Sequence, residues 1–217
     1  MAAKDRVRFR DVFADPGYRR LFFAQTASRA GDAFRTVALA IVVFELTGSG
    51  LGTAGVIVAE ILPVLLLAPV AGELVDRLPR RTVMIAADVW RAALMALLPL
   101  VDSSVGAVYA VAFGLSVGSV FFNPAAGSLV PAMVEERQLV AANSAIWTAA
   151  VLAQIALAPA AGGIVALLGA TPAFLLNAAT YAASALLLLG LRVPAAPAST
   201  SAAESWAGRV REGLSLL

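Results

Sequence analysis

Two carboxyl groups that could exchange protons lie inside long apolar stretches of the sequence. Asp32 stands three residues from both Arg29 and Arg35, and these arginines favour its charged form. Glu60 has no cation within four residues, so the loss of hydration in an apolar environment favours its protonated form. We therefore expect Glu60 to exchange a proton, unless the fold supplies it with a cation. The alternative is a structural glutamate that ties two helices together by hydrogen bonds.

Asp32 belongs to a polar stripe on an otherwise apolar segment. At 100° per residue, six polar side chains of this segment fall within about 120° of arc, which gives a helix with one polar face. Charges at membrane depth usually face a cavity or a protein partner. The stripe therefore either lines a cavity or forms ion pairs with a purely structural role. Its members are Gln25, Ser28, Arg29, Asp32, Arg35 and Thr36.

The composition indicates a protein that spans a lipid bilayer. Of the 217 residues, 60% are hydrophobic and 14% are charged, whereas soluble domains carry about 25% charged residues. Histidine and cysteine are absent, which excludes the commonest general base and metal ligand, thiolate chemistry and disulfides. The phosphate-binding motif Gly-x-x-x-x-Gly-Lys-Ser/Thr is absent too. We expect no catalytic residue, no cofactor, no metal site and no nucleic-acid partner.

Six segments of the sequence are long and apolar enough to cross a bilayer, which takes about 20 residues of helix. The first segment carries its charges in its first half, and its purely apolar run, 37–44, covers only about 12 Å of helix. The charged half must therefore lie in the membrane as well, against protein or water. We predict an all-α membrane bundle with spans at 20–46, 51–75, 82–101, 105–125, 141–167 and 172–191.

The lysines and arginines predict how the spans are oriented. Thirteen of the sixteen lie in the N-terminal segment, in the second and fourth connections and in the tail, and none lies in the other three connections. The remaining three lie inside spans. The positive-inside rule places the basic connections in the cytoplasm. We expect a multi-pass protein of the cytoplasmic membrane with both termini cytoplasmic.

The chain changes character after residue 191, which divides it into a six-helix transmembrane domain, 1–191, and a cytoplasmic tail, 192–217. The tail begins with a linker rich in alanine, proline and serine. Trp206, Val210 and Leu214 then recur at helical spacing, which predicts the start of an amphipathic helix on the membrane surface. The sequence stops inside this pattern, so we expect a fragment or one half of a longer protein.

A short charged connection joins the second and third predicted spans. It reads Gly72-x-x-x-Asp76-Arg77-x-x-Arg80-Arg81. This spacing resembles the loop signature of the major facilitator superfamily, although proline stands at position 79, where that signature usually has glycine. The fifth span contains Ala158-Pro159-Ala-Ala-Gly162-Gly163.

That run is similar to the antiporter motif of the same superfamily, with Ala158 in place of its first glycine and Gln154 in place of another. The segment Phe121-Phe-Asn-Pro-Ala125 and the dipeptide Gly31-Asp32 resemble the exporter branch that includes enterobactin and macrolide efflux permeases.

The resemblance implies a twelve-helix carrier made of two six-helix halves, with a small-molecule substrate held between them. This chain matches the N-terminal half, so its implied partners are the bilayer, the substrate, protons, and a C-terminal half or a second copy. Asp76, Arg77 and Arg81 are implied to hold the cytoplasmic gate, and Asp88 and Arg91 to extend the charge network. We expect export of a small amphipathic compound by alternating access, in exchange for protons.

Three other interpretations stay open at the level of sequence. The chain could be a membrane scaffold or gene remnant that transports nothing, or a half-size carrier that acts as a homodimer. An intramembrane enzyme would have to use the paired carboxylates of Asp32 and Glu60, which lack the motif context of aspartyl enzymes. We therefore do not expect an enzyme.

Overall fold

The part of the chain that the computed structural model describes, residues 9–193, consists of helices and their connections. The predicted all-α architecture is confirmed. The linker and the predicted amphipathic helix lie outside the described residues from position 194 onward. The long helices are α2 (Pro16–Thr47), α3 (Gly50–Arg77), α4 (Arg80–Leu97), α5 (Val105–Leu129), α6 (Leu139–Leu168) and α7 (Ala170–Leu189). The short elements are α1 (Phe9–Val12) and the 3-10 turns Leu98–Leu100, Val130–Ala132 and Glu136–Gln138.

Capping residues set the ends of the long helices. The Asp15 carboxylate accepts a hydrogen bond from the backbone N–H of Tyr18 at 2.6 Å, which satisfies a free donor at the start of α2. Gly48 ends α2 in the left-handed region with φ of 62°, where glycine carries no steric penalty. The Ser49 hydroxyl then caps α3 by accepting from the N–H of Leu51. A two-residue connection therefore reverses the chain between α2 and α3.

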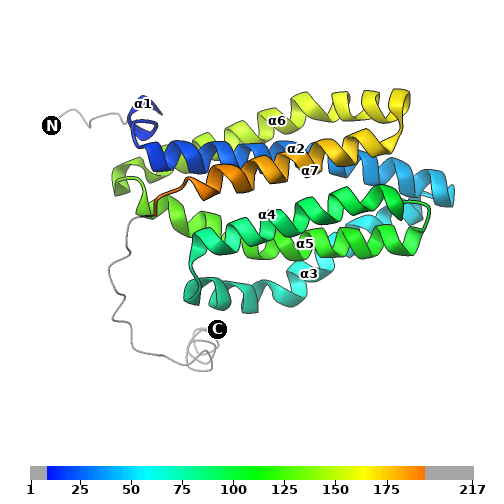
Figure 1. Ribbon diagram of the computed structural model, residues 1–217, viewed down its shortest axis with the longest axis horizontal. Coiled ribbons are helices and arrows are strands. Elements are labelled where there is room, and N and C mark those ends of the chain that lie inside the picture. Colours follow the sequence, from blue (N-terminus) through cyan, green and yellow to red (C-terminus); the bar gives the residue numbers. More distant parts are fainter. Residues whose placement is uncertain (1–8, 194–217) are drawn as a thin grey trace, which may run out of the picture.

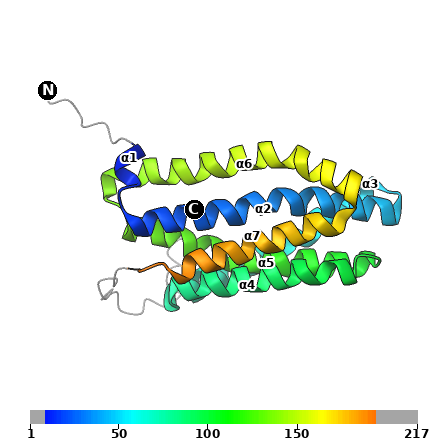
Figure 2. The same ribbon diagram turned by 45° about the horizontal axis from the view of Figure 1, so that its top comes forward.

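The six long helices form two groups of three, α2–α4 and α5–α7, that pack into each other. The first helix of each group packs mainly against helices of the other group. Helix α2 lies between α6 and α7, and α5 lies beside α3 and α4. The third helices, α4 and α7, also pack together. Figure 1 shows the resulting order across the bundle as α6, α2, α7, α4, α5 and α3, and Figure 2 shows α2 between α6 and α7 from a second direction.

Five of these helices are long and apolar enough to cross a membrane, namely α3 to α7 with their short 3-10 extensions. The protein is therefore a multi-pass membrane protein by length and composition. The first predicted span, α2, does not meet this measure in the described part of the chain, because charged side chains interrupt its 32 residues. Exactly six spans are thus not confirmed, although six long helices are present among residues 9–193.

Helix α7, the sixth predicted span, turns a polar face toward the inside of the bundle. The polar residues Asn177, Tyr181 and Ser184 of α7 are fully buried, because α7 packs against α2 and α4. Gly31 makes the contact with α2 possible: a Cβ there would overlap the side chains of Thr180 and Asn177. The exposed helices are α3 and α6, in which only 17% and 11% of the most apolar window is buried.

A layer of buried polar side chains separates two apolar clusters along the bundle. One cluster gathers around the second half of α2, from Phe34 to Val43, and the first parts of α5 and α7. The other gathers around the start of α2, the start of α4 and the end of α7. Between them in sequence, on four different helices, lie the buried residues Ser28, Asp88, Arg91, Ser116 and Ser184.

Candidate functional site

The most deeply buried charges among the described residues are Asp88 and Arg91, one turn apart on α4. Their side chains form an ion pair, and the two residues are 0% and 2% exposed. Burying either charge alone would cost several kcal/mol. Each charge therefore makes the burial of the other possible, while the role of this pair in the charge network of the gate stays a prediction.

The guanidinium of Arg91 joins four helices. It lies between the rings of Phe122 on α5 and Tyr181 on α7, 4.4 Å from each ring centroid. It also donates hydrogen bonds to the hydroxyls of Ser28 on α2, at 3.2 Å, and Ser119 on α5, at 3.5 Å. A cation that faces aromatic rings on two sides is stabilised by both. Arg91 is thus fixed in place by groups from every neighbouring helix.

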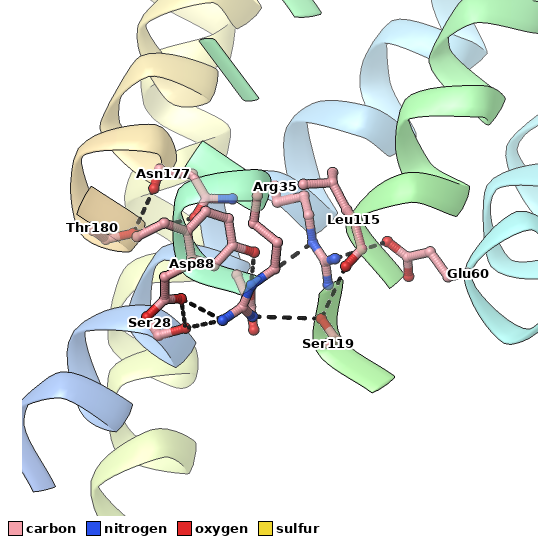
Figure 3. A network of polar contacts seen from close by, with 11 residues as sticks. Ser28, Arg35, Glu60, Asp88, Leu115, Ser119, Asn177 and Thr180 are labelled. Atoms are coloured by element: carbon pink, nitrogen blue, oxygen red, sulfur yellow. Dashed lines mark hydrogen bonds and ion pairs between the residues drawn. The ribbon is translucent and has the colours of Figure 1, made fainter. Parts of the chain in front are cut away.

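A second charge cluster lies beside the first and contains Asp32, Arg35 and Glu60 (Figure 3). The Nη1 atom of Arg35 is 3.6 Å from Oε1 of Glu60 on α3, and its Nε atom is 3.9 Å from Oδ1 of Asp32. The hydroxyl of Tyr181 donates a hydrogen bond of 2.5 Å to that same Oδ1. These contacts link α2, α3 and α7.

The fold therefore supplies Glu60 with a cation that its own stretch of sequence lacks, which removes the sequence argument for proton exchange at this residue. The cation is Arg35, which lies 25 positions away in sequence and on a different helix, so spacing along the chain could not reveal it. The expectation that Asp32 is flanked by two arginines holds only for Arg35. Arg29 forms no ion pair within residues 9–193, and it faces a cavity instead.

The cavity has a volume of about 400 Å³ and lies between α2, α4, α5 and α6. It brings together Arg29 and Asp32 from the predicted polar stripe with Arg91 from α4, while Gln25 is buried outside it. Its wall combines cations, a carboxylate, amides and an indole, so it can bind a molecule that has both polar and apolar parts. Its lining residues are Ser28, Arg29, Asp32, Arg91, Ser119, Phe122, Asn123, Trp147, Ala150, Val151 and Gln154.

The second charge cluster can bind and release one positively charged species, either a proton or another cation. Two carboxylates, Asp32 and Glu60, share one guanidinium, Arg35, so the cluster carries one net negative charge when both acids are ionised. An uncompensated charge at membrane depth is costly. One proton on either carboxyl group would neutralise the cluster, and a cation bound there would do the same.

The residues of the charged connection after α3 divide into two groups. Arg81 donates to the carbonyl oxygen of Leu188, at 2.8 Å, and to that of Leu189 at the end of α7. Arg80 reaches the Ser128 carbonyl at 3.5 Å. These two arginines thus bind within the bundle. By contrast, Arg77 pairs with Glu73 on the surface.

Asp76 and Gly72 face outward. Asp76 is exposed and makes no ion pair or hydrogen bond in the described part of the chain, and a Cβ on Gly72 would meet no atom within 4 Å. The residues of the antiporter-like motif also face open space and not the bundle. Pro159 is exposed on α6, and open space surrounds Gly162 and Gly163. None of the three motif residues lines the cavity.

Sequence reasoning missed Tyr181, Ser119 and Trp147. Tyr181 had a detectable signal, because Asn177, Tyr181 and Ser184 recur at spacings of four and three residues, which puts three polar groups on one helix face. A polar face on a membrane helix usually points into protein. Ser119 and Trp147 carried no such signal, since each is a single polar or amphipathic residue in an apolar run.

The arrangement of the helices is shared with a solved transporter. A crystal structure of an autoinhibited peptide transporter of the POT family has this fold: the two superpose with a TM-score of 0.75 at 14% identity, over 90% of this chain and 41% of that one. The chain belongs to the family of major facilitator superfamily transporters described as transmembrane secretion effectors, whose family model matches residues 11–216.

Two bacterial relatives support this assignment. The uncharacterized MFS-type transporter YvqJ of Bacillus subtilis is 25% identical over 211 residues, which cover 92% of this chain and 50% of the relative. Macrolide efflux protein A of Streptococcus pyogenes is 32% identical over 123 residues, 55% of this chain and 30% of the relative. The resemblance to the macrolide exporter branch is thus confirmed. The chain spans half or less of the length of these relatives.

Proposed function

We propose that this chain is the N-terminal six-helix half of a secondary transporter that exports a small molecule by alternating access in exchange for protons. The observation that carries the proposal is the grouping of six charged side chains from α2, α3 and α4 midway along the bundle, three of which, Arg29, Asp32 and Arg91, line one cavity. Transporter sites of this class lie near the bilayer midplane. Charged side chains at that depth are costly to bury, so their presence favours a role in transport.

The proton site in this proposal is the acid pair Asp32 and Glu60 around Arg35. Although the fold supplies Glu60 with Arg35, Glu60 is the proposed proton acceptor of the two, because Asp32 already accepts the hydrogen bond of Tyr181. Proton uptake by Glu60 would remove the only net charge of the cluster. The neutral cluster is less costly to enclose in a membrane, so proton binding favours a state in which the cavity is closed to water.

The partner in this proposal covers the exposed faces of α3 and α6. Large apolar side chains such as Leu65 and Ile155 are 71% and 67% exposed on them. A C-terminal six-helix half would bury them, and a second copy of this chain is the alternative. Open space around Gly162 and Gly163 on α6 would allow the partner's helices to approach closely.

The cytoplasmic gate in this proposal is the connection after α3. Arg81 and Arg80 fix the connection to its own bundle, and Asp76 remains available for a partner. The basic residues at this end, read by the positive-inside rule, support a cytoplasmic position for it and for both termini. The cytoplasmic membrane is then the site of action.

The substrate class follows from the cavity and from one relative. The cavity offers charged, amide and aromatic groups side by side, and a macrolide, the compound class in the name of the Streptococcus relative, is a molecule of mixed polarity. A macrolide such as erythromycin is therefore the first compound to test.

The test is proton flux in liposomes that contain a pH-sensitive dye. The chain is reconstituted alone and with a separately supplied C-terminal half, a pH gradient is imposed, and erythromycin is added. We expect erythromycin to release protons across the membrane with the native chain and with Glu45→Gln, a matched control in which an exposed acid of α2 is neutralised. Glu60→Gln removes the response.

Three results distinguish the alternatives. Flux that needs the second half supports the half-transporter, and flux from this chain alone supports a homodimeric carrier. The absence of proton flux and of erythromycin uptake under both conditions supports a scaffold or remnant. An unchanged proton response in Glu60→Gln refutes the proposed proton site.

A further inference from the structure

The three tyrosines of the chain all donate their hydroxyl groups to acceptors inside the bundle, but only one acceptor is charged. Tyr18 donates to the backbone carbonyl of Ala142 at 2.9 Å, and Tyr109 donates to that of Gly52 at 2.6 Å. Tyr181 donates to a carboxylate oxygen of Asp32. The first two are structural contacts between helices. The strength of the third depends on the charge around Asp32.

The oxygen that Tyr181 binds is also the oxygen that faces Arg35. Both contacts are made to Oδ1 of Asp32, with the Tyr181 hydroxyl at 2.5 Å and the Arg35 Nε at 3.9 Å. Arg35 also faces Glu60, with Nη1 3.6 Å from Oε1 of that residue. The hydroxyl and the guanidinium therefore share one carboxylate oxygen, and the charge on Glu60 affects how closely Arg35 approaches that oxygen.

The ring of Tyr181 links Asp32 to the wall of the cavity. It lies 4.4 Å from the guanidinium carbon of Arg91, and Arg91 lines the cavity. The charged groups around the tyrosine are Asp32 and Arg35 on α2, Asp88 and Arg91 on α4, and Glu60 on α3 beyond Arg35. Tyr181 is the side chain that contacts both charge clusters.

We infer that Tyr181 is a positioning residue through which proton uptake by Glu60 changes the cavity wall at Arg91. The inference rests on the proposed function, because it takes Glu60 as the proton site. When the proton binds a carboxylate oxygen of Glu60, the attraction between Glu60 and Arg35 weakens. Arg35 then closes on Oδ1 of Asp32, the Tyr181 hydroxyl loses its share of that oxygen, and the ring shifts over Arg91.

The intrinsic fluorescence of Trp147 reports on this wall, because its indole lines the same cavity as Arg91 and is 65% exposed. The other two tryptophans are replaced by Trp90→Phe and Trp206→Phe, so that one emitter remains. The complete chain is reconstituted into neutral lipid vesicles, and its emission is followed from about pH 8 to about pH 4, a range over which carboxyl groups take up protons.

The expected result is a titration of Trp147 emission in the parent chain that Tyr181→Phe removes. Tyr18→Phe and Tyr109→Phe are the matched controls, since each deletes one hydroxyl whose acceptor is a neutral carbonyl, and both should keep the full titration. Thermal unfolding of each variant in detergent confirms that it is folded. At about pH 8, the losses in melting temperature of Tyr181→Phe and Asp32→Asn, each roughly 5 °C, should not add in the double variant.

Two results separate the inference from the proposed function. If Glu60→Gln keeps the titration, the proton site of the proposed function is wrong, and the inference falls with it. If Glu60→Gln removes the titration and Tyr181→Phe retains it, the proton site stands and the inference about Tyr181 is overturned. Additive losses of melting temperature in the double variant would also overturn the inference, whatever the vesicles show.

Discussion

Replacing Arg91 by leucine should be among the most damaging single changes in the bundle. Leucine keeps an apolar stem of similar reach but removes the cation, and Asp88 is then left 0% exposed and without its counter-ion. Removing one partner of a buried ion pair costs about 3–5 kcal/mol. The loss of contacts with the rings of Phe122 and Tyr181, each 4.4 Å away, places the expected cost in the upper half of that range.

This cost can be measured as a shift in melting temperature. For a chain of this length, 1 kcal/mol corresponds to about 2–4 °C, so Arg91→Leu should melt roughly 8–20 °C below the native chain. Thermal unfolding in a mild detergent, followed by tryptophan emission or by retention of the monomer peak in size exclusion, provides the measurement. The double variant Asp88→Asn with Arg91→Leu should recover more than half of the loss, because it buries no unpaired charge.

The matched control is Arg77→Leu. Arg77 also pairs with an acid on its own helix, Glu73, but its side chain is 72% exposed. Exposed pairs of this kind contribute little, so the melting temperature should change by less than about 2 °C. If Arg91→Leu melts no lower than Arg77→Leu, the Asp88–Arg91 pair is hydrated, and the reasoning from burial is refuted.

Three further changes test other contacts of the bundle. Gly31→Ala should destabilise the chain by about 1–3 kcal/mol, because its methyl group would overlap α7, whereas Gly162→Ala should leave thermal unfolding unchanged; equal effects would show that α2 and α7 do not approach closely there. Arg81→Ala should lower the melting temperature by a few degrees through the loss of its bond to the Leu188 carbonyl, and no change would place that arginine in water. Asp76→Asn should leave melting unchanged and reduce erythromycin-driven proton flux when a second half is present; unchanged flux would remove Asp76 from the gate.

The helices could be predicted from the sequence because their signals are local. Apolar runs of about 20 residues give the spans, and Ser49, Gly48 and Asp15 mark helix ends through hydrogen bonds within a few residues. The polar stripe on the first segment was visible for the same reason, since Arg29, Asp32 and Arg35 fall on one face at 100° per residue.

The pairing between helices could not be predicted, because it depends on which helices become neighbours. Glu60 has no cation near it in sequence, and it gains Arg35 only because α3 lies beside α2. In the same way, Tyr181 is 149 positions from Asp32, and only the packing of α7 against α2 joins them. Spacing along the sequence therefore predicts which charged residues share one face of a helix. The partners of those residues depend on which helices pack side by side.

The end of α7 has a practical consequence for following motion in the membrane. Its last carbonyl groups are bound by arginines from two other helices: Arg20 of α2 donates to Gly190, and Arg81 of α4 donates to Leu188 and Leu189. A spectroscopic label attached at Val193, only a few residues further on and on the surface, would report the rotation of the whole bundle as one rigid body. If this bundle moves against a second six-helix half, as we propose, a label at Val193 paired with one on that half would turn the motion into a distance that can be read in real time.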